Sequence, residues 1–208
     1  VCACEGRSVG INLSYSPVCD LDMNFRNPIT NVRTFGRDPR KVARFAGAYM
    51  DALQQNGVAA CAKHFPGDGV DFRDQHLHPT YNSLSADEWR ASYGMVYRRL
   101  IEGGLQCVMC GHIVQPALSM EKNPSLRPVD CLPASQSPEL LQGVLREELG
   151  FNGLITTDAT IMGGYCMTRE RRKAIPASIM AGCDMLVFST DFHEDYGSVI
   201  TFYDTTGD

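Results

Sequence analysis

The sequence predicts an α/β fold of alternating parallel strands and helices, and it favours a (β/α)8 TIM-like barrel over an open sheet. Short apolar stretches alternate with amphipathic ones along the chain, which is typical of parallel βαβ units. About five strands are visible in 208 residues, which an open sheet would accommodate, because a complete barrel typically takes about 250 residues. Polar residues nevertheless follow several successive strands. Barrels gather such residues at one rim, whereas an open sheet uses only the strands beside its switch point.

Each predicted element has a recognisable start or end. Asp38 can cap the first helix, with Pro39 at its first position, and Gly57 suits its end. Pro176 should kink or shorten the last helix. The predicted strands are 9–18, 58–63, 105–111, 153–158 and 184–188. The predicted helices are 38–57, 87–104, 137–150 and 169–183, with long polar loops at 64–86 and 115–136.

Composition and charge exclude several classes of protein. The net charge of −5 provides no basic surface for nucleic acid, and no apolar run is long enough to span a membrane. Residues 1–10 lack the apolar core of a signal peptide. Nine cysteines, most of them in apolar surroundings, indicate buried reduced thiols and a reducing compartment. Since no linker interrupts the pattern, we expect a single domain over residues 1–208.

Cys107 and Cys110 form a CxxC motif, which admits three interpretations. They could be half of a zinc site, a redox pair, or two thiols in a buried strand. Residues three apart on a strand point to opposite faces, so a regular strand cannot bring both thiols to one metal ion. The spacing therefore favours two buried thiols.

The stretch "KHFPGDGVDFRDQH", residues 63–76, concentrates ionisable groups directly after a buried strand. Asp74 and His76 lie two residues apart, and a carboxylate at this spacing can orient an imidazole for acid/base chemistry. Asp158 ends another apolar strand, where an unpaired aspartate would be costly as core filler. It is therefore a candidate nucleophile or base, with a structural capping role as the alternative.

A metal site is the rival interpretation of this loop. The possible ligands are Asp68, Asp71, Asp74, His76 and His78. The chain lacks HExxH and the EF-hand pattern, and no Walker A or GxGxxG motif follows a strand. We therefore favour an acid/base loop over a metal site.

These residues resemble glycoside hydrolase family 3, and within it the NagZ-like β-N-acetylglucosaminidase branch. That branch carries K-H-F-P-G-H-G followed after a fixed gap by D-S-H, and residues 63–69 and 74–76 keep this spacing. Similar segments continue from about residue 9 to 190, among them "INLSYSPVCDLD", "NPITNVRTFGRDP", "VMCGHIVQPAL" and "LREELGFNGLITTDATIM". Three positions depart from the pattern: Asp68 replaces a His, Gln75 a Ser and Ala159 an Asp.

The resemblance implies a retaining β-N-acetylhexosaminidase that removes terminal β-linked N-acetylglucosamine, for example from peptidoglycan-derived muropeptides, in the cytoplasm. It implies Asp158 as nucleophile, His76 as acid/base and Asp74 as the residue that orients His76. The residues implied to bind the sugar or line its pocket are Arg33, Lys63, His64, His112 and Met162. The implied partner is a saccharide, with no nucleic acid and no membrane. The resemblance also implies that neither a metal ion nor an organic cofactor is required.

Several alternatives stay open beside this hypothesis. The chain is expected to lack the first strands and the last unit of the family's barrel, so an inactive barrel fragment is one of them. A β-glucosaminide phosphorylase, another family 3 β-glycosidase and a metal-dependent hydrolase are the others. Gly67 and Gly69 are expected to let the loop close over the sugar. The sequence leaves the oligomeric state open.

Overall fold

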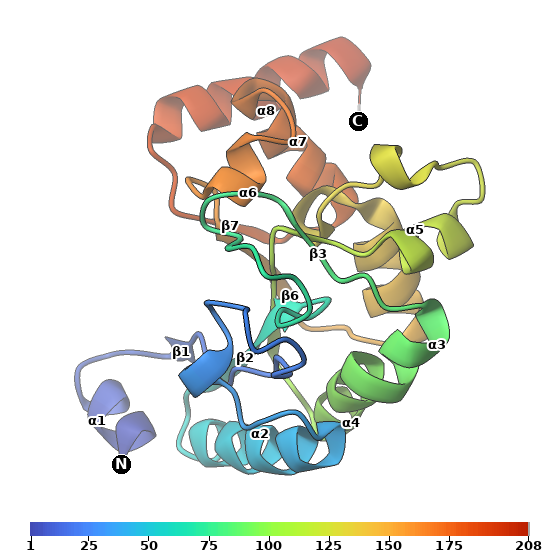
Figure 1. Ribbon diagram of the computed structural model, residues 1–208. Coiled ribbons are helices and arrows are strands. Elements are labelled where there is room, and N and C mark those ends of the chain that lie inside the picture. The colour runs from blue at the N-terminus through green and yellow to red at the C-terminus, as the bar shows by residue number, and fades with distance from the viewer. Residues whose placement is uncertain (208) are drawn as a thin grey trace.

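The computed structural model describes residues 1–207 and shows five parallel strands curving into half of a barrel, with helices on the outside (Figure 1). Spatial order follows chain order, β1-β2-β4-β6-β7, and each neighbouring pair is parallel. The strands are β1 (Leu13–Ser14), β2 (Ala59–Phe65), β4 (Cys107–Cys110), β6 (Leu154–Ala159) and β7 (Met185–Val187). The α/β fold with a partial TIM-like barrel is thereby confirmed.

Two further strands tie the long polar loop to the end of β4. They are β3 (Thr80–Tyr81) and β5 (Ile113–Val114), which pair in parallel. Asn82 N–H extends this contact by donating to the carbonyl of Val114 at 2.8 Å. The segment after β2 is therefore held against the carboxyl end of the next barrel strand.

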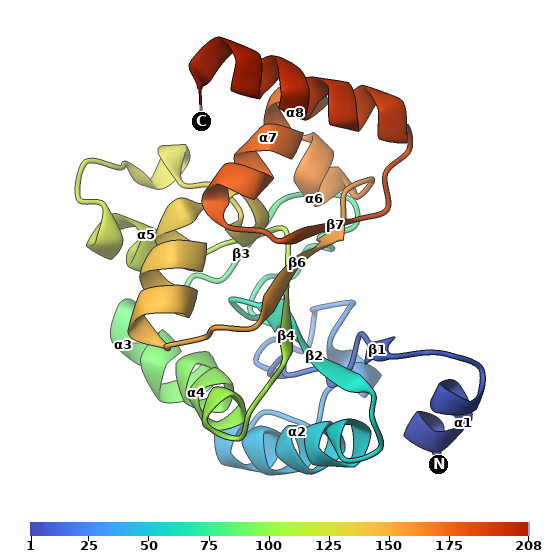
Figure 2. The ribbon, with the colours of Figure 1, turned by 180° about the vertical axis from the view of Figure 1, so that it is seen from behind.

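Helical segments surround the strands, and the two opposite views agree on their placement (Figures 1 and 2). In both views α2 and α4 lie together at one end of the molecule, and α8 crosses α7 at the other. The α-helices are α1 (Cys2–Ser8), α2 (Pro39–Gln54), α3 (Ala86–Trp89), α4 (Met95–Glu102), α5 (Pro116–Lys122), α6 (Gly163–Cys166), α7 (Arg171–Ala181) and α8 (Phe192–Thr206). The 3-10 and π segments are η1 (Asn31–Arg33), η2 (Arg90–Gly94), η3 (Pro128–Asp130), η4 (Ala134–Gln136) and η5 (Glu139–Glu148).

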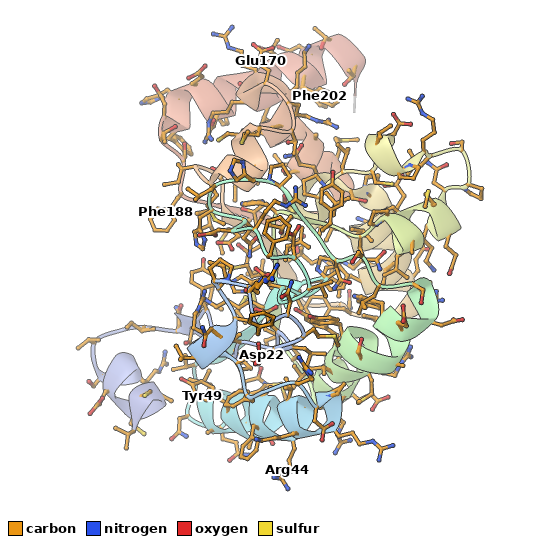
Figure 3. All side chains as sticks on the ribbon, in the orientation of Figure 1. Asp22, Arg44, Tyr49, Glu170, Phe188 and Phe202 are labelled. Carbon is orange, nitrogen blue, oxygen red and sulfur yellow. The ribbon has the colours of Figure 1, made fainter. Side chains whose placement is uncertain are left out.

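The predicted helices are present, and their starts follow the expected chemistry. The Asp38 side chain accepts a hydrogen bond from Arg40 N–H at 3.0 Å, immediately before α2. Pro176 lies inside α7, which is shorter at both ends than the predicted 169–183. Helices α1, α5 and α8 were not expected. The side chains of Arg44 on α2 and Phe188 after β7 both point outward, Arg44 at the α2 end of the molecule and Phe188 at one side (Figure 3).

The two faces of the sheet have different surroundings. Alternate residues such as Ala62, Val108 and Cys110 face the large core under the helices, which includes Trp89. Intervening residues form a small separate cluster on the other face, composed of Cys61, Cys107 and Met109 with Leu13 and Tyr15 against them. Cys107 and Cys110 thus lie on opposite faces as buried free thiols, which confirms that interpretation of the CxxC motif. No described helix is long and apolar enough to cross a membrane.

Candidate active site

Asp20 and His64 form a buried pair at the ends of the first two barrel strands. His64 Nδ1 donates to Asp20 Oδ2 at 2.7 Å, and Asp20 Oδ1 accepts the backbone N–H groups of His64 and Asp68 at 3.1 and 2.8 Å. Burial by itself would raise the pKa of Asp20, but the charge of His64 and these hydrogen bonds outweigh it and lower that pKa. The charge of His64 and these hydrogen bonds thus favour the ionised form of Asp20.

His64 also faces the candidate nucleophile. Its Nε2 lies 3.8 Å from Asp158 Oδ2, while Asp158 Oδ1 accepts the N–H of Ala159 at 2.8 Å. Burial would lower the pKa of His64, but the charges of Asp20 and Asp158 overcome it and raise that pKa. His64 lies between two carboxylates, one buried and one 15% exposed, and both favour its protonated form.

Lys63 and Arg33 bring further positive charge toward Asp158. Lys63 lies half-buried at the end of β2, and Arg33 is exposed in η1. Burial and the charge of Arg33 lower the pKa of Lys63, whereas the charge of Asp158 opposes that shift. Two of the residues expected to bind sugar, His64 and Lys63, thus lie near the candidate nucleophile, and Arg33 lies near Lys63. Their contact with a sugar stays a prediction.

Asp74 and His76 form the second pair of the site. His76 Nδ1 donates to Asp74 Oδ1 at 2.6 Å, and the same oxygen accepts His76 N–H at 2.8 Å. Because Nδ1 is occupied, Nε2 is the ring nitrogen left to exchange a proton. The carbonyl of His76 accepts the N–H of Gly163 at 2.7 Å. The pair is therefore attached to the turn that follows Asp158.

Gly67 and Gly69 lie in closely packed positions at the base of the loop. Both have a positive φ, of 124° and 107°, and both are buried. A Cβ at Gly67 would overlap the ring of Tyr93, and one at Gly69 would overlap the carbonyl of Leu21. These glycines permit close packing at the base of the loop, and closure of the loop over a sugar stays a prediction.

His112 and Met162 are both buried. His112 Nδ1 lies 2.9 Å from Ser135 Oγ, and its Nε2 lies 3.0 Å from the carbonyl of Ala159, to which it donates. Burial is the main cause that lowers the pKa of His112 to about 4. A hydrogen bond from this ring to a sugar would require one of these contacts to break. Met162, 5% exposed, precedes α6. Their roles in sugar binding stay predictions.

The candidate metal ligands of the loop are engaged separately. Asp71 pairs with Arg73 at 2.6 Å, Asp74 pairs with His76, and Asp68 accepts hydrogen bonds from amides. Among residues 1–207, no group of three or more His, Cys, Asp or Glu side chains is arranged to hold a metal ion. The loop contacts thus favour the acid/base interpretation.

Asp20 is the site residue that sequence reasoning did not single out. It ends the "SPVCD" segment, 44 residues before His64, and a signal was present because an aspartate follows an apolar strand there as at Asp158. Its role depends on a pairing between distant segments. The completed arrangement, with a carboxylate and two histidine–aspartate pairs at the carboxyl ends of parallel strands, is typical of α/β-barrel enzymes.

Within that class, the chain belongs to glycosyl hydrolase family 3. The family model "Glycosyl hydrolase family 3 N terminal domain" matches residues 1–205, which confirms the resemblance found in the sequence. A "Beta-N-acetylglucosaminidase/beta-glucosidase" from Cellulomonas fimi is 50% identical over 193 residues, covering 93% of this chain and 34% of its own length. A "Beta-hexosaminidase" from Pseudomonas aeruginosa is 35% identical over 189 residues, covering 91% of this chain and 53% of its own.

Solved structures show the same arrangement. "Beta-glucoside phosphorylase BglX" superposes with a TM-score of 0.97 at 48% identity, covering 99% of this chain and 37% of its own. A family 3 β-N-acetylglucosaminidase from Paenibacillus sp. gives a TM-score of 0.88 at 28% identity, covering 100% and 38%. The chain therefore spans between about a third and a half of the length of these relatives.

Proposed function

We propose that this chain carries the reacting groups of a retaining glycosidase that removes terminal β-linked N-acetylglucosamine. The observation that carries the proposal is the hydrogen bond from Gly163 N–H to the His76 carbonyl, which attaches the Asp74–His76 pair to the turn after Asp158. Double displacement needs a nucleophile and an acid/base group beside one glycosidic bond. The name of the Cellulomonas fimi relative, "Beta-N-acetylglucosaminidase/beta-glucosidase", supports N-acetylglucosamine as the sugar, and the name "Beta-hexosaminidase" of the Pseudomonas aeruginosa relative supports a hexosamine.

In the first proposed step, a carboxylate oxygen of Asp158 attacks the anomeric carbon as the bond from that carbon to the leaving oxygen breaks. His76 gives its Nε2 proton to the leaving oxygen. Asp74 holds the other proton on Nδ1 and stabilises the imidazolium before the transfer. The product is a glycosyl ester on Asp158 and a free alcohol.

In the second step, neutral His76 takes a proton from water while the water oxygen attacks the anomeric carbon. The ester bond breaks, and Asp158 leaves as a carboxylate. Lys63, His64 and Arg33 donate hydrogen bonds to sugar hydroxyls and hold the ring in place through both steps.

A β-glucoside phosphorylase is the second candidate, supported by the TM-score of 0.97 with a protein of that name. In such a reaction phosphate replaces water as the acceptor and the product is a sugar 1-phosphate. A neutral imidazole repels an anionic acceptor less than a carboxylate base would. Lys63 and Arg33 would supply positive charge near the acceptor.

The test measures turnover of two substrates by the 208-residue chain, an aryl β-N-acetylglucosaminide and an aryl β-glucoside. Each is assayed with and without phosphate. Wild type is expected to release free N-acetylglucosamine without phosphate. Asp158→Ala should abolish turnover, and His76→Ala should fail mainly on poor leaving groups. A rate that requires phosphate and yields a sugar 1-phosphate would favour the second candidate. Full activity of Asp158→Ala would contradict both.

The natural aglycone and the location are further proposals. We propose peptidoglycan-derived muropeptides with a terminal N-acetylglucosamine as donors, and the cytoplasm as the compartment. Release of free N-acetylglucosamine from a purified muropeptide, followed by chromatography, tests the first. Fractionation of the source cells with an antibody to this chain tests the second.

A further inference from the structure

Gln75 lies between the two members of the exposed pair but is itself fully buried. Its Nε2 donates to Asp68 Oδ2 at 3.0 Å, and its Oε1 accepts His112 N–H at 2.9 Å. Its backbone carbonyl accepts Gly164 N–H at 3.0 Å. One residue therefore connects the loop to the segment after β2, to the end of β4 and to α6.

Asp68 is the other unusual group in this contact. It is 2% exposed, and its carboxylate accepts from Asn27 Nδ2 at 2.9 Å, from Gly69 N–H at 2.7 Å and from Gln75. These partners are all neutral. Burial and the nearby charge of Asp20 raise the pKa of Asp68 to about 6. A carboxylate buried among amides is costly for folding alone, so its presence calls for a further role.

We propose that Asp68 and Gln75 act as a pair of positioning residues that hold the Asp74–His76 pair at the rim. The Gln75 side chain faces inward, and both its Nε2 and its Oε1 are hydrogen-bonded. The side chains of its neighbours Asp74 and His76 therefore face the solvent side. The catalytic effect of this pair rests on the proposed function. The attachment of the Asp74–His76 pair through Gln75 can be tested without any turnover.

Two glycines at the start of α6, Gly163 and Gly164, pack closely against the backbone of this loop. A Cβ at Gly164 would lie 2.6 Å from the carbonyl of Gln75, and one at Gly163 would overlap the carbonyl of Leu77. Neither position therefore accommodates a side chain. Asp68 and Gln75 are also two of the three positions that depart from the family pattern found in the sequence. That these two departures touch each other indicates that they compensate one another.

Reversing the polarity of the contact tests the pair. Asp68→Asn turns one amide toward another, so two donors face each other across the contact. Gln75→Glu places two carboxylates there instead. In the double variant the new amide at 68 donates to the new carboxylate at 75, whose other oxygen still accepts His112 N–H. The contact is rebuilt with its donor and acceptor exchanged.

Hydrogen–deuterium exchange of peptides covering residues 70–82 is the first readout, since it needs no substrate. Each single variant should accelerate exchange at residues 74–78 about tenfold, as expected for the loss of a buried hydrogen bond, and the double variant should return to within about threefold of wild type. Asp195→Asn is the matched control, because Asp195 is a buried aspartate paired with Arg171 elsewhere. It should leave exchange at residues 74–78 unchanged.

The kinetic readout compares aryl glycosides with poor and activated leaving groups. A misplaced acid/base pair should lower kcat/KM about tenfold or more for poor leaving groups and much less for activated ones. A general folding defect would lower both equally. Unchanged exchange in the single variants, or a double variant as defective as the two singles combined, overturns the inference. If exchange behaves as expected but wild type turns over no substrate, the attachment stands and the proposed function falls.

Discussion

The two histidine–aspartate pairs have nearly the same internal geometry and very different surroundings. In each, Nδ1 donates to the carboxylate, at 2.7 Å for His64 and 2.6 Å for His76, and the aspartate also accepts its histidine's backbone N–H. The side chains of the first pair are 5% and 1% exposed, for His64 and Asp20. Those of the second are 49% and 26% exposed, for His76 and Asp74.

In the proposed mechanism, exposure rather than pairing distinguishes the two pairs. The buried pair is shielded from water, lies beside Asp158 and accepts backbone N–H groups. The exposed pair can give and receive a proton, as the proposed acid/base step requires. A search for His–Asp pairs alone would have found two equal candidates.

Breaking the buried pair should have the largest effect. Asp20→Ala leaves a charged His64 buried and removes an acceptor for two backbone N–H groups. Loss of one member of a buried ion pair typically costs about 3–5 kcal/mol of unfolding free energy. Urea denaturation at pH 7 measures it. Asp130→Ala removes an exposed aspartate paired with Arg127, and it should change stability far less. Equal losses in the two variants would refute the distinction.

His112 sharpens the comparison, because it has no carboxylate partner and stays neutral. Its folded pKa is about 4, whereas an unfolded histidine titrates near 6.5. Below pH 6.5 the unfolded chain therefore takes up a proton that the folded chain does not. The stability from neutral His112 is complete above pH 6.5 and is lost as pH falls toward 4, by roughly 3 kcal/mol.

The variant His112→Gln tests this dependence. It lacks the titrating ring, so its unfolding free energy should fall by roughly 3 kcal/mol less than that of wild type between pH 7 and pH 4. Urea denaturation at three pH values measures the slopes. The control is His193→Gln, which removes an exposed histidine from α8 and should keep the wild-type slope. Parallel curves for wild type and His112→Gln would show that His112 is not neutral in the folded state.

Breaking the exposed pair should have the smallest effect on stability. Asp74→Asn removes the charge but keeps an oxygen that can accept from His76, so we expect a loss of less than about 1 kcal/mol, as for surface pairs. The rate on poor leaving groups should nevertheless fall about 10- to 100-fold. Urea denaturation and steady-state kinetics on one preparation check both. A large stability loss with normal kinetics would reverse the roles of the two pairs.

Local patterns were sufficient to predict a series of parallel strands and the candidate residues at their ends. Apolar runs ending in charged residues marked β2 and β6, and the Asp74–His76 spacing placed both residues in one contact. Helix α8 was not expected, because its large residues, including Tyr196 and Tyr203, stay exposed and form no clear buried stripe.

Pairings between distant segments were beyond sequence reasoning. Asp20 meets His64 only once β1 and β2 lie side by side. Likewise, Gln75 resembles any polar loop residue until β4 brings His112 beneath it. Gly67 suggested a hinge because a glycine's conformational freedom is visible in sequence, whereas the Tyr93 ring that occupies its missing side-chain space is not.

The attachment of Gln75 has a consequence for protein engineering. A designer who moves the acid/base loop into another barrel would naturally cut where the charged pair begins. Such a graft would omit Asp68, seven residues before Gln75, together with the Asn27 amide that donates to it. The transplanted histidine and aspartate would arrive without their support. The smallest segment that can be transferred with its support is therefore discontinuous, and it includes Asp68 and Asn27 as well as the charged pair.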